Sequence, residues 1–143
     1  MRSQEETMAQ NASAFEEALK KQGIVLDRNT HEDNTVFVVP EKVDGIGAVS
    51  LMALFNDSDR YVTLICFKYL TFPEEKKPAV LEMLNTLNAE YTMVKFVETG
   101  NAVSVQVVVP FHDNFSSEVI VDMIALVFRA MQEEHPRLLK VLQ

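Results

Sequence analysis

Cysteine, glycine and tryptophan are scarce in this chain, which has one cysteine, four glycines and no tryptophan among its 143 residues. A single cysteine, Cys66, cannot form a disulfide within the chain, and this is typical of proteins from a reducing compartment. It also leaves no CxxC pair for a zinc or redox site. Gly45 and Gly47 lack the third glycine and the following helix that a dinucleotide-binding loop needs.

Long apolar runs and clusters of basic residues are also missing. The longest apolar runs, such as Ile124–Phe128, are far shorter than the ~20 residues that span a bilayer. The polar amino-terminal stretch MRSQEETMAQ does not have the apolar centre of a signal peptide. Thirteen basic and twenty-one acidic residues give a net charge of −8, spread evenly along the chain. Nucleic-acid binding needs clustered Lys and Arg, so we expect no nucleic-acid partner. The short apolar runs and the polar amino-terminal stretch lead us to expect a cytoplasmic protein that does not bind a membrane.

The apolar pattern predicts a single α+β domain over residues 1–143, with residues 1–4 disordered. Its elements follow the order helix, three strands, helix, two strands, helix. Apolar residues at helical spacing predict helices over residues 5–22 and 77–90, and a third that begins after Ser116 or Ser117. Pro136 is expected to end or kink this last helix.

Five β-branched or alternating stretches predict the strands. They are Thr35–Val39, Ile46–Phe55, Tyr61–Tyr69, Met93–Glu98 and Ala102–Val109. Pro40 is expected to close the first of them, and residues 27–34 are expected to form a polar loop. Short polar turns such as residues 56–59 separate neighbouring strands, which favours antiparallel pairing. We therefore expect a mostly antiparallel five-stranded sheet with helices packed on one face or at its edges.

No group of residues has the spacing of a catalytic or metal site. His31, His112 and His135 stand far apart in the sequence, so we expect no metal, no cofactor and no catalytic residue. His112 and Asp113 have the form of a base with its orienting carboxylate, but Asp113 is more simply a turn or capping residue. Cys66 lies in the middle of a predicted strand, where a cysteine usually acts as a small buried hydrophobe.

An enzyme or small-ligand binder with an unrecognised pocket between sheet and helices remains the alternative. Its best form is a pocket lined by Tyr61, Cys66, Tyr91 and His112.

The segment LNTLNAEYTMVKF, residues 84–96, resembles the YbjN-type bacterial sensory-transduction regulators. The positions that carry the resemblance are Leu84, Asn85, Asn88, Tyr91, Lys95 and Phe96, with the Ser116-Ser117-Glu118 helix start and His135-Pro136. The resemblance implies a small α+β binding module with a fold like that of type III secretion chaperones, dimeric and acting on other proteins. It brings no catalytic residues with it.

The last helix is apolar around most of its circumference, and we expect part of this surface to meet a second chain. A homodimer through a helix face, more specifically that of the helix over residues 77–90, is the predicted solution. The candidate partner or dimer residues are Val80, Met83, Leu87, Met123, Val127 and Met131. The sequence thus favours a non-enzymatic protein-binding module, chaperone-like or regulatory, with a protein partner of unknown identity.

Overall fold

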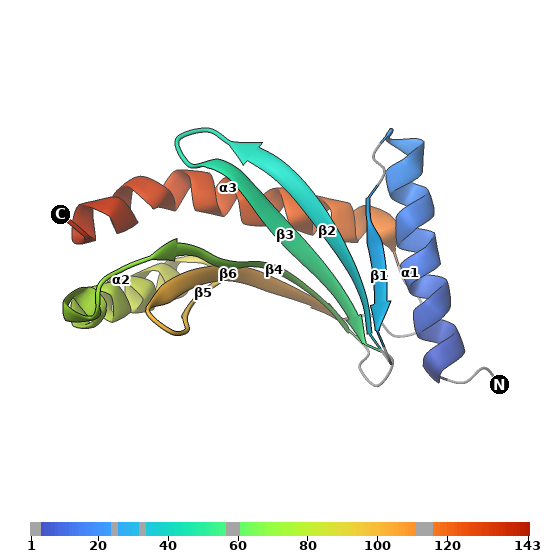
Figure 1. Cartoon of the computed structure of the whole chain (residues 1–143), viewed down its shortest axis with the longest axis horizontal. Coiled ribbons are helices and arrows are strands. Elements are labelled where there is room, and N and C mark those ends of the chain that lie inside the picture. Colours follow the sequence, from blue (N-terminus) through green and yellow to red (C-terminus); the bar gives the residue numbers. More distant parts are fainter. Residues whose placement is uncertain (1–3, 24–25, 32–33, 57–60, 111–115) are drawn as a thin grey trace.

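The computed structural model describes residues 4–23, 26–31, 34–56, 61–110 and 116–143. These residues form three α-helices, one short 3-10 helix and one six-stranded antiparallel sheet (Figure 1). In chain order they are α1 (Gln4–Lys21), β1 (Arg28–His31), β2 (Asn34–Val43), β3 (Gly47–Asn56), β4 (Tyr61–Thr71), η1 (Glu74–Lys76), α2 (Lys77–Glu90), β5 (Lys95–Glu98), β6 (Ala102–Pro110) and α3 (Ser117–Val141).

The predicted α+β class and element order are confirmed, but the sheet has six strands and not five. The additional strand is β1, which lies in the stretch predicted as a polar loop and pairs with the start of β2. Its residues Arg-Asn-Thr-His show no alternation of apolar and polar side chains. Such a polar sequence is tolerated because β1 lies at the edge of the sheet. Pairing with β2 places Arg28 opposite Phe37, and the Arg28 guanidinium lies 5.7 Å from the centre of the Phe37 ring.

The strand order is β1-β2-β3-β4-β6-β5. β2 does not stop at Pro40 as predicted but continues to Val43, with Pro40 opposite Ser50 of β3. Pro40 lies beyond the end of β1, and no described strand pairs with β2 on that side, so the missing N–H deprives no neighbour. Gly45 and Gly47 have φ of +83° and +107° and form the tight turn of this hairpin.

One face of the sheet and the three helices enclose a common core. Phe15 of α1 packs against Phe37 and Phe55, with ring centres 5.1 and 5.6 Å away. Val80, Leu84 and Leu87 bury one face of α2, which packs against β5. The buried face of α3 consists of Ile120, Ile124, Val127, Ala130, Met131, Glu134, His135 and Leu138. Strand side chains alternate between this core and the opposite face of the sheet.

The strands lie close together at one end and fan out at the other (Figure 1). Pairing between β3 and β4 stops at Met52 and Ile65, and the register of β4 on β6 shifts between Cys66 and Leu70. Lys68 has φ of +50° at this irregularity, and its N–H donates to the Ser104 hydroxyl at 2.8 Å. The bulge turns the end of β4 away from the β2–β3 hairpin.

α3 begins as the sequence predicted and extends past Pro136. The Ser116 hydroxyl accepts a hydrogen bond from the N–H of Val119 at 3.4 Å and caps the helix. The helix does not end at Pro136 but continues to Val141. Proline removes one backbone hydrogen bond there, and the contacts of buried His135 and Leu138 on either side hold the last turns in place.

Candidate functional site: the junction of α2, β5 and α3

The densest group of polar contacts among the described residues lies where the end of α2 meets β5 and α3. Asn88, in the last turn of α2, binds both backbone groups of Phe96 on β5. Its amide nitrogen donates to the Phe96 carbonyl at 2.9 Å, and its amide oxygen accepts from the Phe96 N–H at 2.8 Å. β5 is an edge strand, so the Asn88 amide takes the place that a neighbouring strand's peptide group would occupy.

Tyr91 follows α2 directly and joins it to α3. Its hydroxyl donates to Glu134 Oε1 at 3.0 Å and to Glu133 Oε2 at 3.3 Å. Its ring packs on Phe96 with centres 5.4 Å apart, so one side chain contacts all three elements. Partial burial, and then the hydrogen bond and charge of Glu134, raise the pKa of Tyr91, which keeps the phenol protonated at neutral pH.

Arg137 completes the network from α3. Its guanidinium donates to both carboxylate oxygens of Glu90 at 2.8 and 3.3 Å, and to Glu134 Oε2 at 2.9 Å. The hydrogen bond from Arg137 lowers the pKa of Glu90, and the hydrogen bonds to Glu90 and Glu134 raise the pKa of Arg137. The charged groups of the network therefore bind one another, and these charge-assisted hydrogen bonds connect α2 with α3.

His135 faces the sheet from the same part of α3. Its Nδ1 lies 3.3 Å from the Tyr69 hydroxyl of β4, with the two ring centres 5.7 Å apart. Burial lowers the pKa of His135 and raises the pKa of Tyr69. The pair is therefore an uncharged contact between α3 and β4 at neutral pH.

The predicted partner residues lie mostly inside the chain's own core. Val80, Leu87, Val127 and Met131 are almost completely buried, so they offer no surface to a second chain in this fold. Met83 and Met123 are half-buried at the edge of the core. The apolar circumference of α3 is used within the chain, because this helix contacts α1, α2, β4 and β6 at once.

Of the pocket that formed the alternative prediction, the structure does not bring together the three described residues, Tyr61, Cys66 and Tyr91. Cys66 is buried in the core, and burial raises the pKa of its thiol to about 12, as expected of a structural cysteine. Tyr61 is exposed at the start of β4, whereas Tyr91 faces α3. His112, together with Asp113, lies outside the described residues. Within the described part of the chain, no three His, Cys, Asp or Glu side chains are grouped to hold a metal ion.

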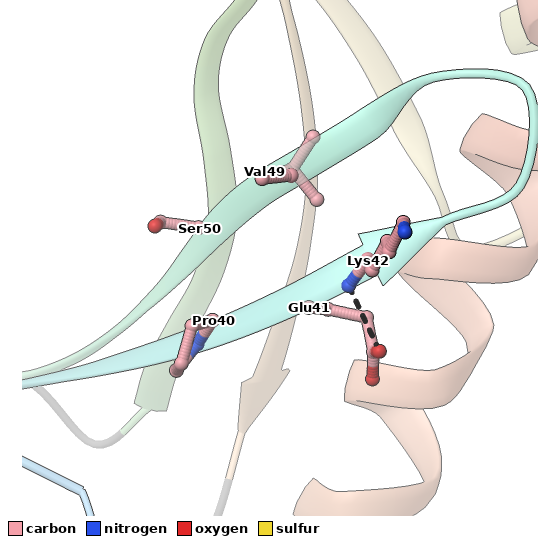
Figure 2. Close-up of a pocket in the computed structure, with 6 residues that line it drawn as sticks. Pro40, Glu41, Lys42, Val49 and Ser50 are labelled. Atoms are coloured by element: carbon pink, nitrogen blue, oxygen red, sulfur yellow. Dashed lines mark hydrogen bonds between the residues drawn. The ribbon is translucent and has the colours of Figure 1, made fainter.

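Two hollows on the surface offer little chemistry. The first, of about 670 Å³, lies on the β2–β3 hairpin between Pro40, Glu41, Lys42, Ala48, Val49 and Ser50 (Figure 2). Its side chains point in different directions, and Glu41 is occupied with the N–H of Lys42 at 3.0 Å. The second, of about 680 Å³, lies between α1 and the start of α3, where Glu17, Lys21 and Glu118 give it mixed charge. Neither has the convergent polar groups of a ligand site.

Sequence reasoning found some residues of the junction and missed others. Asn88, Tyr91, Phe96 and His135 are among the positions that carry the resemblance, and the structure gives each of them a contact between elements. Tyr69, Glu90, Glu134 and Arg137 were not predicted to make contacts between elements. Only the i,i+3 spacing of Glu134 and Arg137 signalled a pair, because Glu90 lies 47 residues away from Arg137.

Comparison with known protein families gives a match over most of the chain. The sequence model of the YbjN family, described as "putative bacterial sensory transduction regulator", matches residues 11–139. No curated protein is similar enough in sequence to match the chain. Among the described helices, none combines the length and the apolar character needed to cross a membrane.

Proposed function

The chain belongs to the YbjN family, and from this premise we propose that it is a non-enzymatic regulator that acts by binding another protein. The observation that carries the proposal is the family match over most of the chain, because the family is described by a regulatory role. A cytoplasmic location and a resemblance to secretion chaperones belong to the same proposal. Both rest on the element order and composition of the chain.

The polar junction supports a binding role over a catalytic one. Its tyrosine, glutamates and arginine bind one another across α2 and α3, and its asparagine binds the backbone of β5. These contacts fix the relative positions of the elements and leave the charged groups little freedom to transfer protons. A rigid scaffold of this kind suits a module that presents a surface to another protein.

Capture of the partner from living cells tests the proposal. The chain, tagged at its chromosomal locus, is cross-linked in cells, isolated and analysed by mass spectrometry beside an unrelated acidic protein with the same tag. We expect one protein to be enriched over that control and to bind the purified chain directly. No enrichment under several growth conditions would contradict the proposal. So would turnover of a metabolite by the purified chain.

A further inference from the structure

The sheet has one face that no described helix covers, and its side chains are unusually apolar. In Figure 1, β2 and β3 pass in front of α3, so the view shows the face of these strands that lies opposite this helix. The positions that point to this side in β2, β3, β4 and β6 form two rows across the sheet. We call them the open face: Val38, Met52, Ile65 and Gln106 in one row, and Val36, Leu54, Thr63 and Val108 in the other.

Six of these eight side chains are aliphatic or methionine, where an antiparallel sheet facing water normally carries polar residues. Seven of the eight are half-buried, and Val108 is 41% exposed. Phe67, next to Ile65 on the same side of β4, is 51% exposed. A contiguous apolar surface of this kind marks an interaction site.

Charge indicates what covers the open face. The chain carries twenty-one acidic residues and a net charge of −8, so two copies repel each other across most of their surface. None of the eight open-face positions is acidic, and neither are Asn29, Pro40, Ser50 and Lys95, which lie beside them in register. At these described positions a basic partner would find no carboxylate to pair with, whereas a second copy brings the same neutral, apolar surface.

The size of the open face also fits a second copy. Counted with one row on either side of it, the open face covers four strands about 4.8 Å apart and about seven residues long, which at ~3.3 Å per residue span roughly 450 Å² before the relief of the side chains is counted. Two such faces bury on the order of 1,000 Å² in total, at the lower end of specific interfaces. We propose that the open face is the surface through which two copies of this chain form a two-fold dimer, sheet against sheet.

The proposal differs from the helix-mediated dimer that the sequence suggested, and sedimentation analysis of matched variants decides between them. The variant Ile65→Lys/Val108→Lys places charge at the centre and the side of the open face. The control Leu81→Lys changes a side chain of α2 that is as exposed as Val108, at 44%. All these substitutions make the net charge less negative, so dissociation cannot come from a larger overall charge on each copy.

We expect the wild-type chain to sediment at twice its 16.2 kDa mass, with a dissociation constant on the order of micromolar. Ile65→Lys/Val108→Lys should weaken the dimer at least ~100-fold, because each copy would bury two unpaired charges. Leu81→Lys should change the dissociation constant by less than about threefold, the effect typical of a residue outside the interface. Circular dichroism checks that each variant is folded, and Ile65→Thr/Val108→Thr, which keeps β-branched residues, replaces the lysine variant if that one unfolds.

Two results would overturn the proposal. One is a wild-type chain that stays monomeric at a few hundred micromolar, which would leave the open face to a different protein. The other is a dimer that Leu81→Lys dissociates and the open-face variant does not. Neither result bears on the regulatory role, which the capture experiment tests separately.

Discussion

His135 is a titratable side chain that the fold uses as an uncharged one. It is buried beside Tyr69 at 3.3 Å, and no carboxylate contact with its ring is present among the described residues. Charging the imidazole inside the protein therefore costs more than charging it in water, and burial lowers its pKa below the ordinary 6.5. Protonation and folding consequently oppose each other at this residue.

The sign of the resulting pH dependence follows directly. Below pH 6.5 the unfolded chain takes up a proton at His135 more readily than the folded chain, so the free energy of unfolding falls with falling pH. We expect the stability difference between the wild type and His135→Gln to shrink from pH 7.5 to pH 5.5, by up to about 1.4 kcal/mol per pH unit.

Urea denaturation of both proteins across this pH range measures the effect. The other two histidines are present in both proteins, so their contributions cancel in the comparison. Parallel stability curves for the wild type and His135→Gln would show that the folded chain accepts the proton without cost.

At the scale of elements, local pattern was sufficient for most helices and strands. The helix over residues 77–90 and the Ser116 cap agree with the prediction, because proline in a first turn and serine before a helix act locally. The sequence did not predict β1, because a short edge strand of polar residues shows no hydrophobic periodicity. The sequence did not predict the pairing of Glu90 with Arg137, because only the folded chain brings these two residues together.

The contact between Asn88 and β5 gives a prediction at this scale. Asn88→Asp keeps the shape of the side chain and the acceptor for the Phe96 N–H but loses the donor to the Phe96 carbonyl. The second carboxylate oxygen would face that carbonyl, so we expect a loss of about 1–3 kcal/mol in the free energy of unfolding. Asn85→Asp, on the exposed side of the same helix, is the matched control and should change it by less than about 0.5 kcal/mol. Equal denaturation midpoints for the two variants would mean that the Asn88 contact contributes nothing to stability.

At the scale of the whole molecule, all charged residues lie outside the eight positions of the open face. Charged residues lie on the outer side of α1, where Lys20 lies 3.6 Å from Glu16. Apolar strand residues are divided between the enclosed core and the open face. The sequence predicted spare apolar surface but assigned it to faces of α3 and α2, with α2 as the more specific site of a homodimer, because hydrophobic periodicity does not reveal how many neighbours an element will contact. The residues predicted to form the partner surface are mostly buried in the core. The apolar residues of the open face are instead alternate positions of the strands.

This separation makes the salt dependence of self-association a test of the interface. Each copy carries a charge of −8, and the open-face residues form no ion pair that salt could weaken. Raising sodium chloride from about 20 to about 300 mM should therefore screen the repulsion between copies and tighten the dimer roughly two- to tenfold. Sedimentation at several chain concentrations in both buffers measures the change. A dimer that loosens with salt would require attractive charge pairs across its interface, and would place that interface on the charged helices instead of the sheet.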